Sequence, residues 1–220
     1  MDREEVKNYL ISQLKTDNQP EDYHLLFEAA KAIANVSGLS IEIGTREGGS
    51  SKWIIDGLLS HQKAIRTHIM VDPYGEIPYV TLDVQETNQN YVIHGRYGND
   101  LRNIAIPGIF ALCEGTWVDP LFFQMTDEQF FKRFADGVPV YIDRQEWIIN
   151  QYALVFLDGP HSLLNVTNEM FFFEPRCDHG SIMVFDDVDL YSHDKIHQYL
   201  ISKKWKPLHK NERKLSYQKQ

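Results

Sequence analysis

Cysteine is scarce in this sequence, and a long apolar run is absent. The two cysteines, Cys113 and Cys177, form neither a metal-binding spacing nor a disulfide framework, so we expect two buried thiols in an intracellular protein. No run of about 18 apolar residues exists, which argues against a membrane-spanning helix and a membrane partner. The first five residues include three acids and no apolar stretch, so we expect no signal peptide and a cytoplasmic location.

A surplus of basic residues is missing as well. The chain of 220 residues has 22 Lys and Arg against 31 Asp and Glu, which gives a net charge of -9. Phosphate contacts need a basic surface, so this balance disfavours a nucleic-acid partner, although a local site can still hold a nucleotide cofactor. Internal repeats, low-complexity segments and Pro/Gly-rich linkers are also lacking, and we therefore expect a single domain over residues 1–220.

Hydrophobic periodicity predicts the elements of that domain. Two helices come first, since apolar residues recur at helical spacing at Val6, Leu10 and Leu14, and then at Leu26, Ala30 and Ile33. Strands are expected over 39–43, 67–71, 121–125, 152–157 and 181–185, helices over 50–59, 126–134, 162–173 and 194–203, and a closing antiparallel pair over 205–209 and 214–217. Residues 73–120 have weak periodicity and receive no clear assignment.

This alternation predicts an α/β fold: a mostly parallel sheet with helices on both faces and an antiparallel strand near the C-terminus. Ligands of such sheets bind beyond the carboxyl ends of the strands. We therefore expect one crevice bounded by the residues that follow the strands, namely Gly44, Asp72, Met125, Asp158 and Asp186. Residues 1–38 are expected to cover this site, and residues 39–220 to form the cofactor-binding and catalytic core.

A glycine-rich turn follows the first expected strand, within the segment Ile41–Ser50. Glycine permits close approach of a ligand, and free amides at the start of the next helix favour an electron-rich group. A purely structural strand-to-helix turn fits the same residues. A dinucleotide site would need the spacing Gly-x-Gly-x-x-Gly, but the residue two after Gly44 is Arg46.

The segment, written E-x-G-x-x-x-G-G-S, resembles motif I of the class I S-adenosylmethionine-dependent methyltransferases. The resemblance implies a Rossmann-like fold in which the glycine loop wraps the methionine part of the cofactor. It also implies that Asp72 accepts hydrogen bonds from the ribose and that Thr126 and Asp127 lie by the adenine, although for Thr126 a helix cap is the preferred interpretation. The implied cofactor-binding residues are Glu42, Gly44, Thr45, Gly48, Ser50, Asp72, Thr126 and Asp127.

Acids end two later strands, at Asp158 and at the pair Asp186–Asp187. Solvated strand ends would explain each acid alone. Three carboxylates gathered in one crevice repel one another, however, and a cation relieves that repulsion. Carboxylate ligands suit a hard ion, so this reasoning predicts a divalent metal, with Mg²⁺ preferred.

The segment Asp158–Ser162 together with Phe185-Asp186-Asp187 resembles the metal-dependent sugar O-methyltransferases of the macrocin type, over residues 39–190. The resemblance implies that Asp158, Asp186 and Asp187 bind the metal and that His161 is the base, so that Asp158 and His161 are catalytic. Pro160 and Ser162-Leu163 depart from the commoner family pattern, which leaves the acceptor open.

The implied function is S-adenosylmethionine-dependent O-methylation of a sugar or another small hydroxyl acceptor. Two other classes stay open: a dinucleotide-dependent oxidoreductase, which the glycine spacing disfavours, and a non-catalytic binding or scaffold protein on the same fold. A homo-oligomer is compatible with the sequence, and nothing in it indicates the number of subunits.

Overall fold

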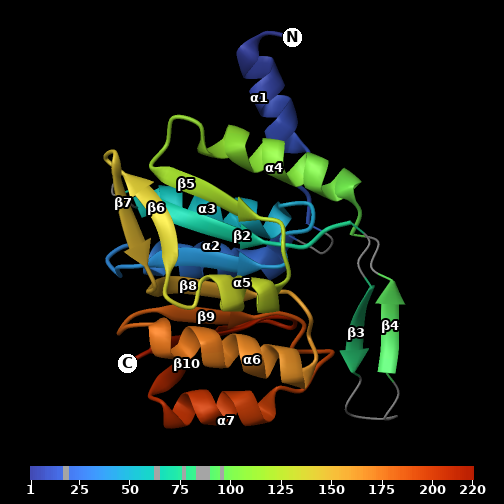
Figure 1. Ribbon diagram of the computed structural model, residues 1–220, viewed down its shortest axis with the longest axis vertical. Coiled ribbons are helices and arrows are strands. Elements are labelled where there is room, and N and C mark those ends of the chain that lie inside the picture. The colour runs from blue at the N-terminus through green and yellow to red at the C-terminus, as the bar shows by residue number, and fades with distance from the viewer. Residues whose placement is uncertain (17–19, 62–64, 76–77, 83–89, 95–96) are drawn as a thin grey trace.

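Strands and helices alternate along the chain in the computed structural model, which describes residues 1–16, 20–61, 65–75, 78–82, 90–94 and 97–220 (Figure 1). The helices are α1 (Arg3–Ser12), α2 (Pro20–Ala32), α3 (Gly49–His61), α4 (Asn99–Cys113), α5 (Asp127–Arg133), α6 (Leu163–Phe173), η1 (Glu174–Arg176) and α7 (Asp194–Ser202). The strands are β1 (Leu39–Ile43), β2 (Arg66–Val71), β3 (Pro78–Leu82), β4 (Asn90–His94), β5 (Val118–Phe123), β6 (Val138–Ile142), β7 (Gln145–Ile149), β8 (Tyr152–Leu157), β9 (Ile182–Phe185), β10 (Trp205–Lys210) and β11 (Leu215–Lys219).

Seven strands form the main sheet in the order β10-β11-β9-β8-β1-β2-β5. The five strands from β9 to β5 pair in parallel, whereas β11 pairs antiparallel with β9 and β10 antiparallel with β11. The predicted fold, a mostly parallel sheet closed by an antiparallel C-terminal pair, is confirmed. β3 and β4 form a separate hairpin, and so do β6 and β7 (Figure 1).

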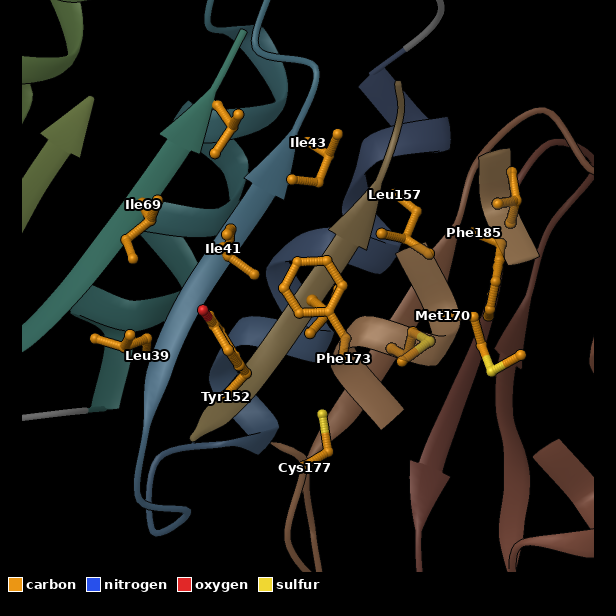
Figure 2. Packing of buried hydrophobic residues seen from close by; sticks show 14 of the residues in the cluster. Leu39, Ile41, Ile43, Ile69, Tyr152, Leu157, Met170, Phe173, Cys177 and Phe185 are labelled. Atoms are coloured by element: carbon orange, nitrogen blue, oxygen red, sulfur yellow. The ribbon is translucent and has the colours of Figure 1, made fainter. Parts of the chain in front are cut away.

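The central strands are apolar on both sides because each side of the sheet carries a layer of helices. On one side Ile41, Val155 and Met183 pack with residues of α5, α6 and α7, and Figure 2 shows part of this cluster. On the other side Leu154 and Val184 pack with residues of α2, α3 and α4. Burying one such side chain is worth roughly 1.5–3 kcal/mol, so the two layers hold the central strands firmly in place.

The N-terminal region follows the expected pattern with one correction. α1 packs on α4 and α2 packs on α3. α1 ends at Ser12, so Leu14 lies beyond the helix and not on its apolar stripe as predicted. Leu14 is buried, and its side chain lies against Gly48 and Gly108. The chain after α1 is thereby held against the glycine-rich turn, which brings the N-terminal region to the predicted crevice.

The third parallel strand was misplaced, and several elements were not predicted at all. β5 begins at Val118, earlier than the predicted start at residue 121, and it contains Pro120. Proline is tolerated there because β5 is the edge strand. α4 contains Pro107 within its span, which obscured its helical signal. In the part of the chain that the structure describes, no helix is long and apolar enough to cross a membrane.

Candidate active site

A cavity of about 360 Å³ opens at the carboxyl ends of the parallel strands, where the sequence predicted it. Residues that follow β1, β2, β8 and β9 line it, together with Lys15, Thr16 and Tyr23 from the N-terminal region. The predicted site residues among its lining are Gly44, Thr45, Ser50, Asp72, Thr126, Asp127, Asp158, His161, Asp186 and Asp187. Met125, which was expected at the same crevice, is not among the lining residues.

Two predicted cofactor-binding residues, Glu42 and Gly48, do not line the cavity. Glu42 is fully buried behind the glycine-rich turn and accepts a short hydrogen bond from the Ser51 hydroxyl. Burial raises the pKa of Glu42 to about 7, against hydrogen bonds from Ser50 and Ser51 that lower it. Gly48 lies against Leu14 and Ile109. Both residues therefore support the turn from behind, because their positions face the protein interior.

Gly44 joins two strand ends at the floor of the cavity. Its φ of +89° is in the left-handed region, and a Cβ there would lie 2.0 Å from the carbonyl oxygen of Asp158. Its amide donates to the carbonyl of Val71, while the amide of Asp158 donates to the carbonyl of Ile43. Only glycine allows this close approach, which places the turn after β1 directly beside the end of β8.

Asp72 ties the glycine-rich turn to the end of β2. The backbone amides of Thr45 and Arg46 donate to its Oδ2 at 3.0 and 2.9 Å, and the amide of Tyr74 donates to its Oδ1 at 2.9 Å. Burial raises its pKa, although these three hydrogen bonds act in the opposite direction. A carboxylate offers about four acceptor positions, and the described residues supply three donors, so Asp72 has the capacity to accept one further hydrogen bond.

The two residues that were predicted to lie by the adenine, Thr126 and Asp127, are at the start of α5. Thr126 and Gln129 form the predicted capping box, with hydrogen bonds of 3.2 and 3.1 Å. Asp127 lines the cavity and lies beside Glu169 of α6, which is 0 % exposed. Burial, followed by the charge of Asp127, raises the pKa of Glu169 well above its usual range. This pair of carboxyl groups was not predicted from the sequence.

The three predicted acids converge around His161, which follows β8. The His161 Nε2 atom lies 3.7 Å from Asp158 Oδ1 and 3.4 Å from Asp187 Oδ2. Burial lowers the pKa of His161 to about 4, so its ring is neutral near pH 7. Burial and then the charge of Asp186 raise the pKa of Asp158. The His161 ring stacks on Tyr191 at 5.2 Å, which fixes its orientation.

Two cations that the sequence reasoning missed pair with these acids. The Lys214 Nζ atom donates to Asp186 Oδ1 at 2.7 Å, with the two side chains 0 % and 4 % exposed. Arg213 donates a short hydrogen bond to Asp187 Oδ1. The predicted closing strand included residue 214, but its lysine was given no role. The sequence signal that could have found this pairing is the predicted antiparallel strand. Such a strand runs back beside β9 and brings its first residue to the acids that follow β9.

The predicted Mg²⁺ site can be tested against this arrangement. Mg²⁺ needs carboxylate oxygens that are free to coordinate it in octahedral geometry. Asp186 and Asp187 are instead bonded to Lys214 and Arg213. Among the described residues, no three His, Cys, Asp or Glu side chains are arranged to hold a metal ion. The acids thus converge as predicted, but as arranged they do not fit the metal.

A family model described as a methyltransferase domain matches residues 41–188, which is more than half of the chain. The chain belongs to this methyltransferase family. The match spans the glycine-rich turn, Asp72, Asp158, His161 and the pair Asp186–Asp187, and so it confirms the family to which the motifs pointed. A comparison with curated proteins gives no match.

Solved structures of O-methyltransferases share the fold. The calicheamicin methyltransferase CalS11 has a TM-score of 0.60 at 16% identity, covering 99% of this chain and 86% of its own. The O-methyltransferase NovP has a TM-score of 0.58 at 14% identity, covering 99% of both chains. TomG from Streptomyces achromogenes has a TM-score of 0.55 at 13% identity, covering 100% of both. The chain is therefore a methyltransferase with the fold of S-adenosylmethionine-dependent O-methyltransferases.

Proposed function

We propose that this methyltransferase transfers the methyl group of S-adenosylmethionine to a hydroxyl group of a small molecule, with a sugar as the preferred acceptor class. The observation that carries the proposal is a single cavity that joins the glycine-rich turn to a neutral histidine surrounded by carboxylates. Support for the acceptor comes from the similar structures, since CalS11 is described as a TDP-rhamnose 3'-O-methyltransferase. TomG, described as an O-methyltransferase, was solved with S-adenosylmethionine.

The residues that line the cavity support a proposed position for the cofactor. The turn containing Gly44, Thr45 and Ser50 would hold the methionine part, next to the start of α3. The remaining acceptor position of Asp72 suits a ribose hydroxyl, and Asp127 suits the adenine amino group. Glu42 and Gly48 then act on cofactor binding through the shape of the turn.

His161 is the proposed general base. When bound, S-adenosylmethionine would supply an electrophilic methyl group and a neutral thioether leaving group. The Nε2 atom of His161 would take the proton of the acceptor hydroxyl. The imidazolium that results lies 3.4 Å from Asp187 Oδ2, and the charge of Asp186 also favours the protonated ring, so these acids offset part of the cost of burying its charge. Holding both reactants in one cavity supplies the remaining catalysis by proximity.

Lys15, Thr16 and Tyr23 line the same cavity, with Lys15 and Thr16 against the glycine-rich turn at Gly49 and Tyr23 beside Lys214. Polar and basic groups of this kind suit an acceptor rich in hydroxyl groups. We leave Mg²⁺ out of the proposed mechanism, because lysine and arginine hold two of the three acids that were predicted to bind it.

Titration calorimetry with S-adenosylhomocysteine and with NAD separates the proposed function from its alternatives. We expect S-adenosylhomocysteine to bind at one site per chain and NAD not to bind. Binding of NAD alone would identify a dinucleotide enzyme, and binding of neither would favour a scaffold protein. A screen of sugars and phenols for methyl transfer from labelled S-adenosylmethionine then identifies the acceptor. Methyl transfer to phenols alone would reject a sugar as the acceptor.

A further inference from the structure

The pairing of Lys214 with Asp186 is built into the sheet. β11 runs antiparallel to β9 with Leu215 opposite Phe185, so the next residue outward on each strand is Lys214 and Asp186. The amide of Val188 donates to the carbonyl of Arg213 at 3.0 Å, which extends the pairing past the end of β9. The backbone register, and not a chance side-chain rotamer, therefore brings the ammonium group to the carboxylate.

The turn before β11 is held in place as well. The Asn211 Oδ1 atom accepts hydrogen bonds from the amides of Arg213 and Lys214, at 3.0 and 2.6 Å. The Asn211 side-chain amide donates to the carbonyl of Asp22 in α2, at 3.0 Å. These contacts tie the two cationic residues to the N-terminal region, which also supplies part of the cavity wall.

The ammonium group of Lys214 lies in an aromatic environment. Its Nζ atom is 4.3 Å from the ring centre of Tyr23 and 5.7 Å from that of Phe156. Aromatic ring faces attract a desolvated cation. A buried ammonium without a charged partner is costly, so Asp186 and the two rings together make this position a site for a fixed positive charge.

The charges at this end of the cavity nearly balance without an added ion. Asp158, Asp186 and Asp187 face the cations Lys214 and Arg213, which leaves at most one negative charge. The sulfonium group of S-adenosylmethionine supplies one positive charge. A divalent cation would add a surplus of positive charge and would first have to displace Lys214 from Asp186.

We propose that Lys214, with Arg213, stands in the place of a divalent cation at these acids, so that methyl transfer needs no metal. Lys214 is a positioning residue: it holds the carboxylate of Asp186 and offsets the repulsion between Asp186 and Asp158. Arg213 holds Asp187, whose other carboxylate oxygen lies 3.4 Å from His161. The inference rests on the proposed function, because it concerns the same reaction.

The first test measures metal binding by the unmodified protein. Mn²⁺ is titrated into the protein with and without S-adenosylhomocysteine, and the electron paramagnetic resonance signal of the free ion is followed. We expect the signal of free Mn²⁺ throughout, and equal rates of methyl transfer with Mg²⁺ and with EDTA. One bound Mn²⁺ per chain in protein that binds S-adenosylhomocysteine would overturn this inference alone. Failure to bind S-adenosylhomocysteine would instead reject the proposed function.

The second test replaces the lysine. Lys214→Met leaves Asp186 unpaired, so we expect gained affinity for Mn²⁺ and a fall in kcat of about tenfold or more, with the affinity for S-adenosylhomocysteine little changed. Lys214→Arg should keep the positive charge and recover part of the turnover without binding Mn²⁺.

The matched control is Lys219→Met. Lys219 lies at the far end of β11 and pairs with Glu174, away from the cavity. This variant should bind no Mn²⁺ and should keep its turnover. Full turnover in Lys214→Met without gained Mn²⁺ affinity would overturn the inference. If Lys214→Met does not fold, the Mn²⁺ titration of the unmodified protein still decides it.

Discussion

The two ends of the cavity satisfy their carboxylates in different ways. At the cofactor end, Asp72 accepts hydrogen bonds from three backbone amides. At the acid end, Asp186 and Asp187 pair with the side chains of Lys214 and Arg213. Most substitutions leave a backbone donor in place, whereas a side-chain cation can be lost in a single substitution. The donors at the cofactor end are therefore robust, and those at the acid end can be tuned by mutation.

The largest effect is expected for a substitution at the acid end. Asp186→Ala leaves the ammonium of Lys214 buried and unpaired, which should cost about 3–5 kcal/mol of unfolding free energy. Urea unfolding of the variant and of the unmodified protein measures this change in unfolding free energy. Asp187→Ala should cost less, because its partner Arg213 is more exposed to solvent. Equal losses in the two variants would show that burial of the lysine does not set the cost.

The next effect concerns catalysis at the same end. His161→Ala removes the proposed base, so kcat for methyl transfer should fall about 10²-fold or more. The affinity for S-adenosylhomocysteine should stay close to that of the unmodified protein, because the glycine-rich turn is untouched. Calorimetry and a labelled-methyl assay measure the two quantities. A variant with unchanged kcat would remove His161 from the mechanism.

At the cofactor end, Asp72→Ala leaves three amides without their acceptor and frees the glycine-rich turn. Hydrogen bonds to a charged group contribute roughly 1.5–3 kcal/mol, so the affinity for S-adenosylhomocysteine should fall about 10- to 100-fold. Asp72→Asn keeps one acceptor oxygen, so its affinity for S-adenosylhomocysteine should fall less than that of Asp72→Ala. Calorimetry at one salt concentration compares the variants. An alanine variant with full affinity would show that the turn keeps its shape without Asp72.

The last effect is small near pH 5 and grows with pH, and it concerns Glu169, whose pKa is raised by burial. Since the unfolded chain ionises near pH 4.5 and the folded protein at higher pH, stability is fully present below pH 4.5 and is lost as the pH rises toward the folded pKa. The slope for one group is about 1.4 kcal/mol per pH unit. Glu169→Gln should therefore be more stable than the unmodified protein above pH 5, by an amount that grows with pH.

Thermal unfolding from pH 5 to pH 8 measures this difference. The exposed Glu146→Gln on β7 is the matched control and should follow the unmodified protein at every pH. Parallel curves for Glu169→Gln and the unmodified protein would show that Glu169 ionises alike in the folded and unfolded chain.

Much of the fold followed from local signals in the sequence. Apolar runs ending in glycine or aspartate predicted β1, β2, β8 and β9, because a parallel strand covered on both sides must be apolar throughout. The same strand ends predicted the place of the cavity, since their carboxyl ends meet at one edge of the sheet. α4 was missed because Pro107 and the residues around it hide its periodicity, and β5 was misplaced because Pro120 interrupts an edge strand.

The sequence by itself therefore determined the alternating fold, the cofactor turn and the gathering of three acids with His161. Only the tertiary structure decided what those acids pair with. Lys214 lies 28 positions from Asp186 in sequence and meets it through the register of two antiparallel strands. Glu169 of α6 likewise interacts with Asp127, which lies 42 positions earlier at the start of α5. Periodicity reports which face of an element is buried, but charge pairing depends on which distant element packs there.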